Sequence, residues 1–313
     1  MAEPILHIKD GYFFEVPKVL WRYHFESIDD VKEQYPFLVK AHPAATVADF
    51  NRGLSGKIII PQPFATLENL HDKASGFAIS KFMILEVVIG LVLVFVFSWL
   101  AQRIATGGPP RGKLWNLFES ALLFVRDEVA LPAMGKHDAE RFTPLLWTMF
   151  FFVLFCNLFG LLPWLGAPTG AFAVTFGLAC VTFATTLVSG IKQFGFVGFW
   201  LNLVPHMELP WWLVPLKMPI FAIELLSLVI KHIILSVRLL ANMVAGHLVL
   251  LGILGLIAVA ADRPSTAHWL MVAGISVTSS TLFSFLELFV AFLQAYVFTF
   301  LSALFIGAAV HHH

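Results

Sequence analysis

The feature that most constrains this chain is a long apolar segment, residues 218–260, that carries charged side chains within it. A helix perpendicular to a bilayer needs only about 20 apolar residues, so a helix of roughly twice that length must be steeply tilted or follow the membrane plane for part of its course. Arg238 lies near its middle. An arginine at the centre of a bilayer costs between about 2.5 and 17 kcal/mol, and its guanidinium cannot escape by losing its proton. Because ionisable groups inside a membrane usually mark ion pathways, the segment indicates transport.

The polar residues of this segment fall on two faces. Glu224, Lys231 and Arg238 are spaced seven apart and Asn242 follows one turn later, which places all four on one helical stripe because a heptad drifts by only about 20°. His247 follows Arg238 by nine residues and so lies on the opposite face. Seven residues correspond to about 10 Å of helical rise, too far for an ion pair. Arg238 therefore needs an acidic partner from another helix or another chain.

The composition identifies a polytopic membrane protein. Hydrophobic residues make up 58% of the chain and charged residues 13%, whereas a soluble domain averages about 25% charged residues. The formal net charge of zero argues against a nucleic-acid partner, which requires a basic surface. Cys156 and Cys180 both lie in apolar runs, so we expect them to be small buried hydrophobes rather than a disulfide or metal ligands.

A glycine-rich stretch has the spacing of a nucleotide-binding loop but lacks its chemistry. Residues 107–113 match that spacing up to Lys113, but Leu114 replaces the hydroxyl that would hold magnesium. Two prolines remove amides that the phosphates would need. We expect no nucleotide site, no metal site and no cofactor.

The predicted fold is all-α, with about five membrane-crossing helices. The spans are expected at about 82–101, 142–164, 171–191, 218–260 and 268–310. The last two are long, tilted and predicted to form a hairpin through a turn at Asp262, Arg263 and Pro264. Apolar residues recur at helical spacing over about 114–131, which predicts an amphipathic helix at the membrane surface.

The regions outside the spans set the expected topology. Residues 1–80 are polar and rich in proline, which predicts an extramembrane segment without a large core; residues 81–310 form the membrane domain. The 102–141 region carries six Lys and Arg and the 165–170 loop none. The positive-inside rule then places the N-terminus outside and the C-terminus in the cytoplasm. The Trp-, Pro- and Gly-rich segment 192–217, with His206 and Glu208 solvated, should follow the cytoplasmic interface.

Several motifs resemble one known family. Residues 236–247, SVRLLANMVAGH, closely resemble the signature of subunit a of F-type ATP synthases. Residues 157–163 (NLFGLLP) and 224–227 (ELLS) agree with that family, as do Glu287 and Gln294 in the last span. The resemblance covers about residues 80–307. Gly160 stands where some members have Asp, so an acidic contribution there is absent.

The resemblance implies a role for each matching residue. Arg238 would be the stator arginine that faces the carboxylates of a rotating c-ring, with Asn242 beside it and Gln294 facing the ring nearby. Glu224 would line an aqueous half-channel to the cytoplasm. His247 and Glu287 would line the half-channel to the outside.

The resemblance also implies assembly partners and a location. The chain would be a non-catalytic subunit that couples proton flow to c-ring rotation, bound to the c-ring, to the b subunits of the peripheral stalk, to the rest of the F-type ATP synthase and to lipid. A bacterial cytoplasmic (inner) membrane is expected rather than the mitochondrial inner membrane.

Three alternatives stay open at this level. Lys231 belongs either to the proton path or to a lipid-headgroup or structural contact. The chain as a whole could instead be a secondary transporter with a charged substrate at mid-membrane, although no internal repeat is visible. The third alternative is a non-catalytic assembly or scaffold protein, which would gain nothing from charged residues buried in the membrane.

Overall fold

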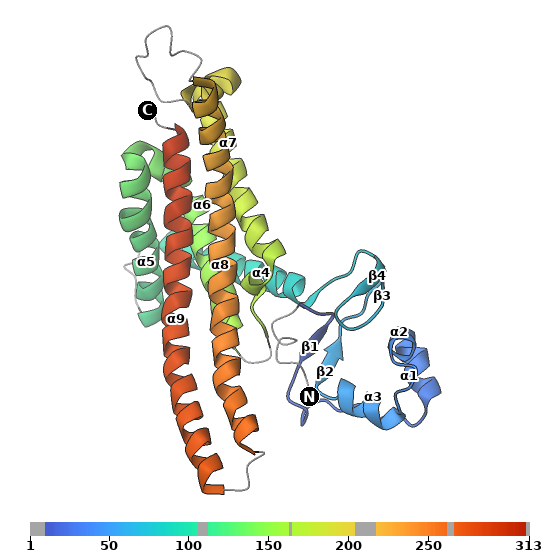
Figure 1. Ribbon diagram of the computed structural model, residues 1–313. Helices are drawn as coiled ribbons and strands as arrows, with labels where there is room; N and C mark the ends of the chain where they lie inside the picture. Colours follow the sequence, from blue (N-terminus) through green and yellow to red (C-terminus); the bar gives the residue numbers. More distant parts are fainter. Residues whose placement is uncertain (1–9, 106–111, 163–164, 204–216, 262–265, 311–313) are drawn as a thin grey trace. The chain divides into compact units, whose positions relative to one another are not determined.

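The computed structural model describes residues 10–105, 112–162, 165–203, 217–261 and 266–310 (Figure 1). The chain forms two compact units. One consists of Met1–Leu91 with Leu158–Pro168, and the other of Val92–Asn157 with Thr169–His313. Each is described by itself below.

The N-terminal part of the first unit holds short strands and short helices. Its elements are β1 (Phe13–Glu15), α1 (Ile28–Gln34), α2 (Pro36–Ala41), α3 (Val47–Leu54), β2 (Lys57–Ile59), β3 (Ala65–Leu67) and β4 (Lys73–Gly76). Strand β1 pairs antiparallel with β2, and β3 pairs antiparallel with β4. These four strands are not part of the all-helical prediction, which holds for the rest of the described chain.

Local hydrogen bonds and a small core define this N-terminal part. Ser27 and Thr46 each begin a helix with a reciprocal capping box, which satisfies backbone donors at the helix start. The hydroxyl and the amide of Thr46 bond to the Asp49 carboxylate and lower the pKa of that carboxyl group, because both bonds favour its charged form. A core cluster is formed by four buried side chains, Val31, Leu38, Phe50 and Leu54, with partly buried hydrophobic residues packed against them. The extramembrane position of this segment stays a prediction.

Five helical stretches are long and apolar enough to cross a membrane, which confirms the predicted number. The helices that follow β4 along the chain are α4 (Lys81–Ala105), α5 (Lys113–Phe124), α6 (Leu131–Gly160), α7 (Phe172–Asn202), α8 (Lys217–Ala261) and α9 (Thr266–Val310). A π-helical segment, Val125–Ala130, joins α5 to α6, and a short 3₁₀ turn, Pro168–Gly170, precedes α7.

The predicted surface helix and the second span are one helical run. The sequence predicted a helix over 114–131 and a span over 142–164, but α5, the π-helical segment and α6 continue without a loop and α6 ends at Gly160. The change of direction occurs at Gly135, whose backbone has φ 74° and ψ 169°. Glycine adopts such a conformation without steric cost, so one residue redirects the chain where we expected a connecting segment.

Helix α7 also extends beyond its predicted end at residue 191. It continues to Asn202 with a break at Gly195, where φ is 74° and ψ is 167°. The chain turns back there, and the Phe199 ring lies so close to Gly190 that a Cβ at that position would overlap it. The remainder of the predicted interface segment, including His206 and Glu208, lies outside the described residues. So do the turn at 262–264, residues 107–111 of the glycine-rich stretch and the final histidines.

The two cysteines differ in their surroundings. Cys156 is buried in α6, as predicted, and Cys180 is exposed. The prediction was wrong for Cys180 because α7 buries a different face, which carries Thr175, Ala179 and Thr182.

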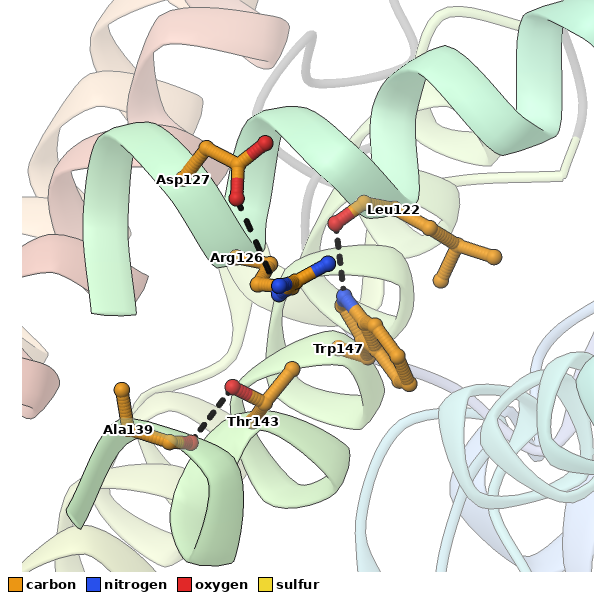
Figure 2. A network of polar contacts seen from close by, with 6 residues as sticks. All are labelled: Leu122, Arg126, Asp127, Ala139, Thr143 and Trp147. Atoms are coloured by element: carbon orange, nitrogen blue, oxygen red, sulfur yellow. Dashed lines mark hydrogen bonds and ion pairs between the residues drawn. The ribbon is translucent and has the colours of Figure 1, made fainter. Parts of the chain in front are cut away.

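A hydrogen bond joins the middle of α6 to α5, within a group of polar contacts (Figure 2). The Trp147 indole donates to the Leu122 carbonyl at 2.9 Å, which provides the partner that an indole N–H needs when it is withdrawn from water. Arg126 and Asp127 form an ion pair at 3.7 Å with both side chains about half exposed. Such a pair contributes little, so the indole bond is the specific link.

Helices α7, α8 and α9 pack against one another and form the centre of the second unit. The two long helices α8 and α9 lie side by side (Figure 1), which confirms the predicted hairpin. Their tilt in a membrane stays a prediction. The buried face of α9 is rich in small residues, among them Ser276, Ala291, Ala295 and Ala303. Small residues let helices approach closely in a membrane, where apolar contact alone gives no preference for helix over lipid.

One buried amide joins three segments of this unit. Asn157, at the end of α6, is 2% exposed. Its Nδ2 donates to the Ala291 carbonyl of α9 at 3.2 Å, and its Oδ1 accepts from the Thr169 hydroxyl at 2.8 Å. Thr169 is completely buried in the 3₁₀ turn, so its hydroxyl depends on this partner.

We predict that Asn157→Leu destabilises the protein by about 1–3 kcal/mol, because the buried Thr169 hydroxyl loses its acceptor. The measurement is the temperature at which the purified, detergent-solubilised protein loses half of its native signal. Thr148→Val is the matched control, since Thr148 is exposed on the same helix and bonds only to the Pro144 carbonyl of its own turn. Equal melting temperatures for the two variants would contradict the role given to Asn157.

Candidate functional site

The Arg238 side chain is exposed on α8. None of the described acidic residues forms an ion pair with it, and the described residues give it no hydrogen bond. The large side chains near it on the exposed surface are apolar, including Ile234 at 51% and Val237 at 45% exposure. Arg238 is thus a permanent charge on an apolar face, available to a group from outside the described chain.

One turn beyond Arg238, an amide pair joins α8 to α9. The Asn242 Nδ2 donates to the Gln294 Oε1 at 2.6 Å. Gln294 is 2% exposed, and its own Nε2 is buried without a hydrogen-bond partner in the described structure. This pair brings together two of the predicted site residues and fixes the register of the two helices close to Arg238.

A second contact between the same helices brings His247 and Glu287 together. The His247 Nδ1 lies 3.7 Å from the Glu287 Oε1, which is beyond hydrogen-bond distance. The Glu287 side chain is 7% exposed and that of His247 20%. Both carboxylate oxygens and the His247 Nε2 are buried without hydrogen-bond partners among the described residues. His247 and Glu287 therefore lie next to each other, and the Nε2 of His247 and both carboxylate oxygens of Glu287 can still form hydrogen bonds.

Gly246, which the sequence patterns did not single out, makes room for this arrangement. A Cβ at Gly246 would lie 2.5 Å from the Glu287 Oε1 and 3.1 Å from its Cδ. The missing side chain of Gly246 therefore leaves the space that the carboxylate occupies. A glycine inside a helical pattern was the available signal, but Gly252 and Gly255 of the same helix meet nothing within 4 Å, so the sequence alone did not distinguish Gly246.

Glu224 and Lys231 lie on the wall of a separate pocket of about 100 Å³. That volume holds several water molecules, since one needs about 10–15 Å³ by this measure. The pocket lies among the C-terminal ends of α7 and α9 and the first part of α8, and its other lining residues are Phe199, Asn202, Leu203, Leu228, Phe305, Ala308 and Ala309. The seven-residue spacing correctly predicted that Glu224 and Lys231 share a face.

The polar groups therefore form two clusters along α8 with Arg238 between them. Glu224 precedes Arg238 by 14 residues and His247 follows it by nine, which correspond to about 21 Å and 14 Å of helical rise. The pocket of Glu224 includes neither Arg238 nor Glu287. Among the described residues, no group of three or more His, Cys, Asp or Glu is placed to hold a metal ion.

A family model and several individual proteins match this chain, and all of them are named as the same ATP synthase subunit. The family model described as ATP synthase A chain matches residues 83–307. The chain is similar to proteins named ATP synthase subunit a from several bacteria. The protein from Myxococcus xanthus (strain DK1622) is 41% identical over 250 residues, 79% of this chain and 78% of the relative. That from Anaeromyxobacter sp. (strain Fw109-5) is 34% identical over 311 residues, 98% of this chain and 70% of the relative. That from Chloroherpeton thalassium (strain ATCC 35110 / GB-78) is 38% identical over 256 residues, 80% and 73% of the two chains.

We predict that Gly246→Ala displaces the Glu287 carboxylate and destabilises the protein by roughly 1–3 kcal/mol, the usual cost of overfilling a packed interior. Melting of the purified protein in detergent measures the change. Gly252→Ala on the same helix is the control, because a Cβ there meets nothing within 4 Å; it should be neutral or slightly stabilising. A Gly246→Ala protein as stable as the control would show that the carboxylate does not need this space.

Proposed function

Because the chain belongs to the ATP synthase A chain family, we propose that it moves protons by a mechanism centred on Arg238. The chain is part of the membrane sector, Fo, of a bacterial F-type ATP synthase, and proton translocation is the general role of the family. The finer proposal is that protons pass through two offset half-channels and turn a neighbouring c-ring. The observation that carries it is a guanidinium on an apolar face, without an acidic partner among the described residues, between two separate polar clusters.

The charge of Arg238 explains why a rotor carboxyl group would ionise beside it. A carboxyl group that arrives from lipid is protonated, because burial disfavours its charged form. An opposite charge within about 4–6 Å favours the ionised form. The carboxyl group then releases its proton near Arg238 and is free to take up another from a second channel.

The separation of the two clusters supplies the second requirement. A continuous water-filled pore would leak protons without turning the ring. Here the Glu224 pocket lies on one side of Arg238 along α8 and the His247–Glu287 pair on the other. A fixed cation between them repels a proton that would hop directly, so each proton must travel on the rotor. The driving force is about 2.3 kcal/mol per charge for each 100 mV of membrane potential.

Each cluster has chemistry suited to one half-channel. In the proposal, Glu224 lines the path to the cytoplasm, and Lys231 shares its pocket. His247 and Glu287 relay protons on the outer side, because an imidazole nitrogen and a carboxylate oxygen can each accept and release a proton. Asn242, which is exposed on α8, faces the c-ring, and its hydrogen bond to the buried Gln294 holds the two helices in register. The c-ring and the b subunits of the peripheral stalk are the proposed partners, and the proposed topology keeps the N-terminus outside and the C-terminus in the cytoplasm.

The alternative of a secondary transporter receives less support from this arrangement. Such a protein would gather its charged residues around one substrate site near mid-membrane. Glu224 and Glu287 instead belong to separate clusters, and Arg238 lies exposed on α8 between them, in neither cluster.

We predict that Arg238→Ala lowers ATP-driven proton pumping at least about 100-fold, the scale expected when a positioned charge is lost. Arg238→Lys should also fail, because an ammonium lacks the planar guanidinium and can deprotonate. The measurement is acidification of membrane vesicles on addition of ATP, normalised to the amount of assembled complex. Since the side chain is exposed and unpaired in the described structure, assembly should be unaffected. Normal pumping by Arg238→Ala would remove the basis of the proposal.

We predict that Glu287→Gln slows proton entry roughly 10- to 100-fold, because a positioned acid or base typically contributes at least that much to a proton transfer. The rate of ATP synthesis driven by an imposed proton gradient reports it. Glu128→Gln makes the same chemical change at an exposed carboxylate in the π-helical segment and should leave the rate unchanged. A rate for Glu287→Gln that matches this control would assign Glu287 a structural role alone.

A further inference from the structure

A buried histidine in α8 is not used by the mechanism above. His232 is 4% exposed. Its ring lies between two aromatic rings from the neighbouring helices, with centroid distances of 5.1 Å to Phe183 of α7 and 4.9 Å to Phe305 of α9. An apolar ring would fill this space equally well, so packing alone does not explain an imidazole there.

The hydrogen bonds of His232 define the state of its two nitrogens. The Nδ1 lies 2.8 Å from the Leu228 carbonyl oxygen. A carbonyl only accepts, so in the neutral ring Nδ1 carries the hydrogen and Nε2 presents a lone pair. The Nε2 is buried and has no hydrogen-bond partner in the described structure. Buried polar atoms are nearly always paired with protein groups or water, so this lone pair indicates a place for a water molecule or a proton.

The position of His232 connects the Glu224 pocket with the level of Arg238. Leu228 and Phe305 both line that pocket and both contact the His232 ring. One turn later on the same face, the Ser236 hydroxyl donates to the Thr175 Oγ1 of α7 at 3.2 Å, and both residues are completely buried. Ser236 lies two residues before Arg238. The buried polar groups thus continue from the pocket through His232 to the turn that carries Arg238.

We propose that His232 is an additional proton-relay residue of the half-channel that begins at Glu224. Its Nε2 accepts the excess proton of a hydronium ion on the pocket side, which leaves water, and then releases a proton from the same nitrogen to a water molecule on the Ser236 side, which returns the imidazole to its neutral form. The Nδ1–H stays on the Leu228 carbonyl throughout. This assignment rests on the proposed function and adds to it a residue that makes the path continuous.

The groups that face His232 among the described residues include no carboxylate paired with it. The cation next to it on α8 is Lys231, and the packed helices α7 and α9 contribute the rings of Phe183 and Phe305. In the part of the chain that the structure describes, no carboxylate forms an ion pair with His232. A proton on Nε2 is therefore not held in place by a carboxylate, which a relay requires.

Two substitutions test the assignment in the complete ATP synthase. His232→Phe keeps an aromatic ring between Phe183 and Phe305 but removes the lone pair. His232→Gln keeps hydrogen-bonding capacity but does not titrate near neutrality. The measurement is passive proton flow through membrane vesicles from which the catalytic sector has been stripped, normalised to assembled c-ring and stator. Leu239→Met, a buried change one heptad further along α8, is the packing control.

We expect both His232 variants to conduct protons about tenfold more slowly than the control; the loss is smaller than the 10²–10⁴ typical of an acid–base group because water can bypass one member of a relay. Normal flow in either variant would overturn the proposal, since flow through His232→Gln would show that a hydrogen bond suffices. ATP-driven pumping by Arg238→Ala vesicles distinguishes a failure of the half-channel mechanism from a failure of the His232 assignment. If they pump normally, the half-channel mechanism itself fails; if they do not and His232→Phe conducts normally, only the relay assignment fails.

Discussion

The constraint on which the rest of this structure depends is a guanidinium that keeps its charge on an apolar surface. Arg238 is exposed among large aliphatic side chains, and the described residues offer it no acidic partner. In hydrocarbon this charge is costly and cannot be removed by deprotonation. It is compensated when a carboxylate from a neighbouring subunit lies opposite, which fits a chain of the ATP synthase A chain family. The long hairpin of α8 and α9 is the support that holds the charge in place.

The hairpin positions its polar groups by close contact between helices. Asn242 bonds Gln294, Gly246 leaves room for the Glu287 carboxylate, and Asn157 ties the end of α6 to α9. Each contact fixes the register of α9, because a shift of either helix would leave a buried polar atom without its neighbour. The cost of unpaired groups in a low-dielectric interior makes this register specific. Several atoms nevertheless have no partner among the described residues, notably the oxygens of Glu287 and the Nε2 of His232. They lie where the proposed mechanism needs groups that can take up a proton.

Much of this organisation could be predicted from local sequence. The number of apolar helices, the hairpin and the shared face of Glu224 and Lys231 follow from segment length and from the period of a single helix. The same rules failed at Gly135 and Gly195, where the chain breaks direction and helix continues into residues that were expected to belong to connecting segments. A positive φ at one glycine is decided by packing on either side of it, and the periodicity of apolar residues does not record it.

The sequence by itself determined that Arg238 lies inside an apolar helix, on the stripe that also carries Glu224 and Lys231, because one helix has a fixed angular repeat. It also placed His247 on another face. Only the tertiary structure decided which groups of α9 meet these residues, with Glu287 beside His247 over Gly246 and Gln294 beside Asn242. The tertiary structure alone also decided that His232 is buried between Phe183 and Phe305. The physical reason is that contacts between residues about 40 or more positions apart depend on how side chains of separate helices interlock, and the repeat of one helix carries no information about its neighbour.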